Sequence, residues 1–180
     1  MHHTRQNCVT EWSLTSGRLY ADPFSDVTVD VAVTAPDGGE QVVPTFWRGD
    51  SSWTVRYAAA TAGEYRWRSV CSDAANDDLH GREGVITVGE YAGPNHLLRH
   101  GAIRPSEDRR HFEHADGTPF LWLGDTWWMG LCDRLEWPGD FQTLAADRVA
   151  KGFNVVQIVA GLYPDMDGFE RRGANEAGHP

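Results

Sequence analysis

The sequence predicts a β-sandwich followed by the beginning of a parallel α/β domain. Between Val9 and about Tyr91, short segments of alternating apolar residues are separated by turn residues roughly every 8–12 positions, as in antiparallel sandwiches. Beyond residue 110 the pattern changes to an apolar strand, a helix and a second apolar strand joined by short loops. A crossover of this kind makes its two strands parallel.

The clearest sandwich strand is the segment 26–34. Valines occupy every second position of it, and they therefore share one face. The other strands follow turns that are rich in Gly, Pro, Asp and Ser. They are expected at 41–47, 53–57, 64–71 and 84–89. The polar stretch 72–82 separates the last two.

The boundary between the two parts is expected at Gly93-Pro94-Asn95, where turn residues cluster. We therefore expect the sandwich to occupy residues 1–92, a linker to occupy 93–109, and the α/β part to occupy 110–180.

The α/β part is expected to begin with a hairpin around the turn Asp116-Gly117. The second arm of this hairpin, 120–123, is continuously apolar, as in a strand that is buried on both faces. A helix should follow from about Pro138, with Gly152 as its C-terminal cap. An apolar strand at 153–159 then completes the unit.

Composition and charge exclude some classes of function. The 180 residues contain 16 basic and 26 acidic side chains, a net charge of −10, which disfavours a nucleic-acid partner. No apolar run approaches the roughly 18 residues of a membrane span, and the polar N-terminus lacks the apolar core of a secretory signal. Cys8, Cys71 and Cys132 form no recognisable pair, so we expect reduced thiols and a cytoplasmic protein.

The strongest candidate site follows the first apolar strand. Asp125 lies there with Thr126, Trp127 and Trp128, and Gln157 lies near the end of the second apolar strand. Chemistry in parallel α/β folds collects at the carboxyl ends of strands, and a carboxylate beside two indoles is typical of saccharide recognition. The alternatives are that Asp125 caps a loop through backbone N–H groups and that the tryptophans fill a core.

Other candidates are weaker. His111 and His114 would point to opposite faces of a strand, so no shared metal is expected. Asp165 and Asp167 lie in a glycine-rich stretch that is typical of a solvated turn. No phosphate-binding loop, dinucleotide fingerprint or nucleophile elbow is present, so no cofactor is expected, and no pair of catalytic carboxylates can be assigned.

Two sets of motifs resemble known families. The segments 116–128 and 148–157 resemble the start of the DUF4038, apiosidase-like family of glycoside-hydrolase (β/α)8 barrels, and the ending 175–180 resembles that family's loop after the second strand. The first ninety residues are similar to the DUF5060 β-sandwich that commonly precedes such barrels. The motifs that carry this similarity are Asp22-Pro-Phe24, Phe46-Trp-Arg-Gly-Asp50, Trp53-Thr-Val-Arg56 and Gly63-Glu-Tyr-Arg-Trp67.

The resemblance implies a glycoside hydrolase with a carbohydrate substrate and an incomplete (β/α)8 TIM barrel, of which the chain holds the first two βα units. The catalytic acid/base and nucleophile would follow later strands, beyond Pro180, so residues 1–180 alone should be inactive. The alternative is a non-catalytic carbohydrate-binding protein. The residues that the resemblance assigns to substrate binding are Asp125, Thr126, Trp127, Trp128, Gln157 and Asn175.

Overall fold

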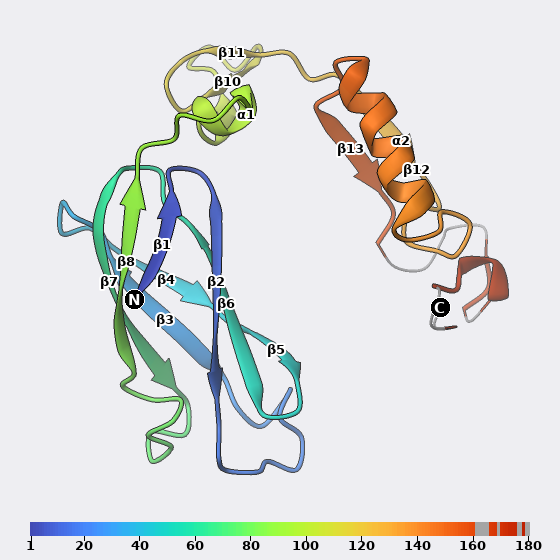
Figure 1. Ribbon diagram of the computed structural model, residues 1–180. Helices are drawn as coiled ribbons and strands as arrows, with labels where there is room; N and C mark the ends of the chain where they lie inside the picture. The colour runs from blue at the N-terminus through green and yellow to red at the C-terminus, as the bar shows by residue number, and fades with distance from the viewer. Residues whose placement is uncertain (161–165, 169, 176–177, 179–180) are drawn as a thin grey trace. The chain divides into compact units, whose positions relative to one another are not determined.

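The computed structural model describes residues 1–160, 166–168, 170–175 and 178 (Figure 1). The chain divides into two compact units. Unit 1 comprises Met1–Pro119, and unit 2 comprises Phe120–Pro180.

Unit 1 contains the β-sandwich that the sequence predicts. Its first sheet has five strands in the order β1-β8-β7-β3-β4, and its second has three in the order β2-β6-β5. Neighbouring strands are antiparallel apart from β1 and β8, which are parallel. The bounds are β1 His2–Arg5, β2 Val9–Thr15, β3 Val29–Thr34, β4 Glu40–Pro44, β5 Phe46–Gly49, β6 Ser52–Ala58, β7 Gly63–Cys71 and β8 Glu83–Gly89.

The core of unit 1 lies between the inward faces of these sheets. The valines at 27, 29, 31 and 33 are all buried, so the predicted face of this segment is confirmed, although β3 itself begins at Val29. Three tryptophans fill the same core, namely Trp12, Trp53 and Trp67. Buried apolar area is the main stabilising term of such a domain.

Glycine is required at position 84 because the Trp67 indole lies directly over it. A Cβ atom built on Gly84 would lie 2.6–2.7 Å from three atoms of the Trp67 ring. We predict that Gly84→Ala lowers the free energy of unfolding of the sandwich by about 1–3 kcal/mol, through overpacking. Urea unfolding measures this loss. Gly89→Ala in the same strand β8 is the control, since the one atom that a Cβ there would meet within 4 Å is the carbonyl oxygen of Thr4, at 3.9 Å.

Residues 93–119, which include the expected linker 93–109, contain regular secondary structure. They contain α1 (His96–Arg99), β9 (Ile103–Pro105) and β10 (Phe112–His114), and β10 lies between β9 and β11 (Pro119–Phe120) in a small sheet. β9 lies in the expected linker and β10 lies in the expected α/β part, so their pairing crosses the expected boundary at 109/110. Unit 1 extends to Pro119. The division into independently folding domains remains a prediction.

Side chains connect this segment to the sandwich and to itself. Asn7, which has a left-handed φ of 61°, donates from Nδ2 to the carbonyl oxygen of Leu98 over 2.7 Å. His100 Nδ1 and Asp116 Oδ2 are hydrogen-bonded at 2.7 Å, and the hydrogen bonds of Asp116 to His100 and to the N–H of Thr118 hold the pKa of its carboxyl group well below the usual value.

Unit 2 contains the expected strand–helix–strand arrangement, as β12 (Gly124–Trp127), α2 (Gly139–Ala150) and β13 (Val155–Ile158). A short 3-10 helix, η1 (Arg171–Gly173), follows. β12 and β13 pair in parallel, as predicted. Gly152 has a φ of 83°, and the N–H groups of Gly152 and Phe153 bond to the carbonyl groups of Val149 and Arg148, which is the Schellman arrangement that glycine favours.

The first strand of this unit lies later in the chain than predicted. The apolar run 120–123 was expected as a strand buried on both faces, but Leu121 is 77% exposed and β12 begins at Gly124. The side chain of Asn154 bonds to the backbone of this run. Its Nδ2 donates to the carbonyl oxygen of Leu121 over 2.6 Å, and its Oδ1 accepts from the N–H of Leu123 over 3.0 Å.

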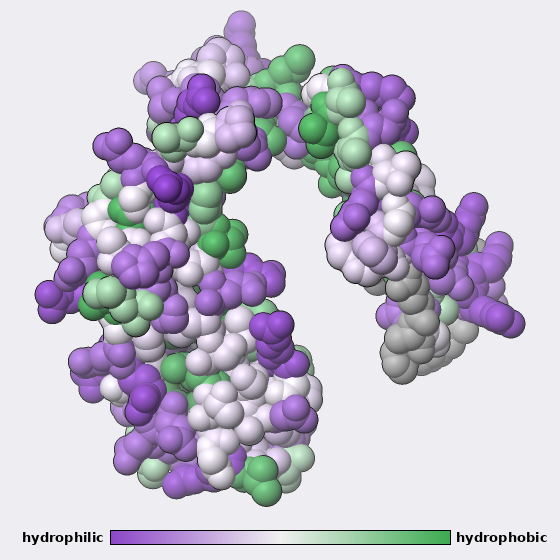
Figure 2. All heavy atoms as spheres, in the orientation of Figure 1, coloured by the Kyte–Doolittle hydropathy of each residue, from purple (hydrophilic) through white to green (hydrophobic). Residues whose placement is uncertain are grey.

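The surfaces of the two units differ in character. The visible face of unit 1 is mostly hydrophilic, with scattered hydrophobic residues, whereas hydrophobic residues gather on unit 2 near the carboxyl end of α2 (Figure 2). Within α2, whose residues are all described, none is buried, and Val149 is 72% exposed. In the described part of the chain, no helix has the length and apolar character needed to cross a bilayer.

Candidate functional site

The candidate site lies at the carboxyl edge of the parallel pair β12 and β13. The register pairs Asp125 with Val156, Thr126 with Gln157, and Trp127 with Ile158, so both strands end at the same edge. Residues 128–138 leave β12 at this edge and lead into α2. Ligands of parallel α/β folds bind at such an edge.

Asp125 and Trp127 lie on the face of β12 that α2 covers. Side chains two residues apart in a strand share a face, and here Asp125 forms an ion pair with Arg148 of α2. Trp127 is 8% exposed, and its ring lies edge-on to that of Phe141 of α2, with centroids 5.5 Å apart. The indole Nε1 of Trp127 donates to Asp125 Oδ2 over 2.9 Å.

These contacts keep Asp125 ionised. Hydrogen bonds from the Arg148 guanidinium and the Trp127 indole lower the pKa of the Asp125 carboxyl group. The same contact raises the pKa of Arg148. A lowered carboxyl pKa stabilises the folded state above the unfolded pKa, and this contribution is lost as the pH falls through the folded value. Asp125 also accepts from the N–H of Thr126, so the loop-cap alternative describes one of its three bonds.

Thr126 and Gln157 lie on the opposite face of the sheet. They are register partners, and both side chains are exposed. Trp128, directly after β12, is 57% exposed. The predicted site residues are therefore divided, with Asp125 and Trp127 against α2, and Thr126 and Gln157 on the other face.

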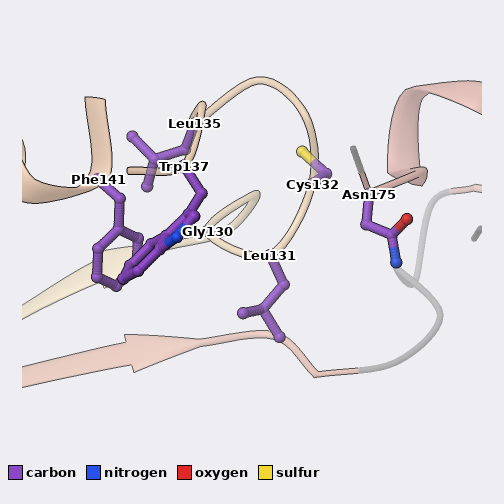
Figure 3. A pocket seen from close by; sticks show the side chains of 7 residues that line it. All are labelled: Gly130, Leu131, Cys132, Leu135, Trp137, Phe141 and Asn175. Carbon is purple, nitrogen blue, oxygen red and sulfur yellow. The ribbon is translucent and has the colours of Figure 1, made fainter. Parts of the chain in front are cut away.

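A largely apolar pocket of about 490 Å³ lies in unit 2 at this edge. Trp137 and Phe141 lie side by side at one side of it, with ring centroids 5.2 Å apart, and Cys132 and Asn175 lie at the other (Figure 3). The other lining residues are Gly130, Leu131 and Leu135. Asn175 is thus the one predicted site residue that reaches the pocket.

The segment before Asn175 is fixed to the loop that follows β12. The N–H of Asp133 donates to the carbonyl oxygen of Ala174 over 2.9 Å, and Ala174 is buried. The remainder of the predicted family loop, at 176–177 and 179–180, lies outside the described residues, as does Asp165.

Three carboxyl groups of unit 2 are partners in ion pairs. Cationic neighbours lower the pKa values of Asp125, Asp147 and Glu170. Asp125 pairs with Arg148, Asp147 pairs with both Lys151 and Arg148, and Glu170 pairs with Arg172. Among the described residues, no cluster of His, Cys, Asp and Glu side chains has the arrangement of a metal site. His114 is buried and its Nδ1 lies 2.8 Å from the carbonyl oxygen of Gly101.

Unit 1 has a second hollow, of about 570 Å³, on the outer face of its five-stranded sheet. Arg66 and Arg68, which alternate with buried residues along β7, line it together with Glu40 and Glu83. The 3.8 Å separation of Arg68 from Glu83 exceeds a hydrogen bond.

Sequence reasoning missed most of the pocket. Leu131, Cys132, Leu135 and Trp137 belong to a loop without periodicity, and Arg148 appeared as part of a motif without a partner. The available signal was Trp137-Pro138 directly before a helix, since a large aromatic residue at a strand–helix corner often packs against that helix.

Comparison with known proteins gives two family matches. Residues 4–72 match the model described as Domain of unknown function (DUF5060), and residues 106–177 match the model described as Apiosidase-like, catalytic domain. The resemblance predicted from the motifs, a DUF5060 sandwich followed by an apiosidase-like domain, is therefore confirmed. No curated protein matches the chain.

Among solved structures, the chain is similar to a crystal structure described as "a putative glycoside hydrolase" from Bacteroides vulgatus ATCC 8482. The TM-score is 0.68 and the identity 22%, and the match covers 94% of this chain and 32% of the other. The chain thus spans about a third of that protein's length. At this identity the likeness concerns the fold alone.

Proposed function

Because residues 106–177 match the apiosidase-like catalytic domain, we propose that the chain is the N-terminal portion of a glycoside hydrolase that cleaves glycosidic bonds in a polysaccharide or oligosaccharide. The observation that carries this proposal is the position of the match, which includes β12, α2 and β13 and the carboxyl edge at which they meet.

In this proposal, β12, α2 and β13 are the first βα units of a (β/α)8 barrel. The parallel pairing of β12 with β13, joined through α2, supports this. Parallel strands in α/β folds are usually flanked by further strands and covered on both faces. The match covers 32% of the similar crystal structure, so the remaining length of that protein is sufficient for such strands.

The saccharide would bind at the carboxyl edge. We assign Thr126, Trp128, Gln157 and Asn175 to direct contact, because the first three are exposed and Asn175 lines the pocket. Exposed indole rings suit the apolar C–H faces of sugars, and amide groups suit their hydroxyl groups. Asp125 and Trp127 belong to the same edge but face α2. The catalytic carboxylates would follow later strands, beyond Pro180.

Replacing Gln157 tests the assigned surface. Losing one hydrogen bond to a neutral ligand should weaken binding roughly 3- to 10-fold. Calorimetry with a panel of cell-wall oligosaccharides, including apiose-containing ones as the family description suggests, would measure the dissociation constants of the wild type and of Gln157→Ala.

Arg68→Ala is the matched control, because this change removes a polar side chain from the hollow on the sandwich. The proposal expects this variant to bind as the wild type does. If Arg68→Ala abolished binding and Gln157→Ala preserved it, the non-catalytic carbohydrate-binding sandwich would be the better description.

A further inference from the structure

We propose that Asp125 and Arg148 are positioning residues, which hold the aromatic wall of the pocket in place across the strand–helix junction. The effect on saccharide binding rests on the proposed function, whereas the effect on the pocket itself does not.

The Asp125 carboxylate accepts hydrogen bonds at both of its oxygen atoms. Its Oδ1 accepts from the N–H of Thr126, and its Oδ2 accepts from Trp127 Nε1 and from Arg148 Nε. Both oxygen atoms therefore serve contacts within the strand–helix unit. Charge-assisted hydrogen bonds of this kind are stronger than neutral ones, so they fix the direction of the carboxylate.

Three aromatic rings connect Asp125 to the pocket. Trp127, held by Asp125, lies edge-on to Phe141 at an interplanar angle of 88°. Phe141 in turn lies against Trp137, and these two rings form one wall of the pocket (Figure 3). The carbonyl oxygen of Trp127 also accepts from the N–H of Gly130, another lining residue.

Arg148 makes further contacts that hold it in place. It lies in the last turn of α2, where its carbonyl oxygen accepts from the N–H of Phe153 over 3.0 Å. Its guanidinium lies 5.6 Å from the centre of the Phe153 ring, and it also pairs with Asp147. Because the backbone bond to Phe153, the contact with the Phe153 ring and the ion pair with Asp147 all restrain Arg148, we infer that Arg148 fixes the position of the Asp125 side chain. An Asp125 side chain alone would lack this support.

The thiol of Cys132 reports on the pocket without any saccharide. Cys132 lines the pocket, is 3% exposed, and donates from Sγ to the carbonyl oxygen of Met129. Cys8 and Cys71 lie in unit 1 and are also free, so they serve as internal references. Labelling of the full chain with 4,4′-dithiodipyridine, followed by peptide mass spectrometry, gives a rate for each cysteine.

We expect Asp125→Ala and Arg148→Ala to raise the labelling rate of Cys132 by about 10-fold or more through local opening of the pocket wall, while the rate of Cys71 stays unchanged. Arg148→Lys should restore part of the protection, because lysine keeps the charge but not the planar fork. Asp140→Ala is the matched control, since it removes a carboxylate from the first turn of the same helix.

A second variant distinguishes opening of the pocket wall from unfolding of α2. If Asp125→Ala loses the helical signal of α2 in circular dichroism, Asp125→Asn decides, because asparagine retains an acceptor for Trp127 and loses the ion pair. Faster Cys132 labelling in Asp125→Asn with α2 intact supports the proposal. Unchanged Cys132 rates in Asp125→Asn and Arg148→Ala, or an equal increase in Asp140→Ala, overturn it. Absence of saccharide binding by the wild type would contradict the proposed function alone.

Discussion

Replacing Ile86 by alanine is expected to lower the free energy of unfolding of the sandwich by about 2–5 kcal/mol. Ile86 is fully buried in β8, where the register places it beside Tyr65 of β7 and His2 of β1. The loss combines the transfer of three carbon atoms with the cavity that they leave. A domain of this size is stable by only roughly 5–15 kcal/mol, so the change removes a large share of its stability.

Amide hydrogen exchange of peptides from β7 and β8 measures this effect on unit 1 without a contribution from unit 2. Val42→Ala is the control, because it shortens a β-branched side chain that is 62% exposed on β4. The control should change stability by less than about 0.5 kcal/mol. Similar values for the two variants would mean that the inward face of β8 does not carry the core.

The sandwich was predictable because its strands are amphipathic. Alternation marked the buried face of the valine segment and of β7, whose residues 65, 67, 69 and 71 are buried while 66, 68 and 70 are exposed. β1 was not expected. Its sequence, His-His-Thr-Arg, has no apolar side chain, and backbone pairing with β8, 80 or so residues away, is what makes it a strand.

The apolar run 120–123 misled the prediction for a related reason. Hydropathy reports how apolar a segment is, but the ladder bonds of a strand depend on the partner that it meets. Here the side chain of Asn154 bonds to Leu121 and Leu123, the backbone N–H groups of Asn154 and Val155 donate to the carbonyl oxygen of Leu123, and the regular ladder of β13 begins only with β12. Only a prediction of contacts distant in sequence would have located these bonds.

The sequence predicted the candidate residues at the carboxyl edge of two parallel strands, but it did not predict how they divide between the two faces of the sheet. The motif at 124–128 carries consecutive polar and aromatic residues, and alternation along β12 sends Asp125 and Trp127 to one face and Thr126 to the other. Which face α2 covers follows from Arg148 and Phe141, two contacts made across the crossover. The pocket beside them depends on a loop that has no periodic signal.

Three carboxyl groups of unit 2 lack the electrostatics of a general acid. A glycosidase needs a carboxylic acid whose pKa is raised and, for retention, a second carboxylate about 5 Å away. Asp125, Asp147 and Glu170 have pKa values lowered by cationic neighbours, which is the opposite of what a general acid requires.

Purified residues 1–180 should therefore release no chromophore above the buffer blank from a panel of 4-nitrophenyl glycosides. General acid catalysis alone contributes about 10²–10⁴-fold, and the covalent step is lost with it. Absorbance at alkaline pH after long incubation measures the release, with Asp125→Asn as the matched control at the same blank level. Turnover by the wild type would contradict the proposal that the catalytic carboxylates lie beyond Pro180. Turnover that survives Asp125→Asn would show in addition that the Asp125 carboxylate takes no part in the chemistry.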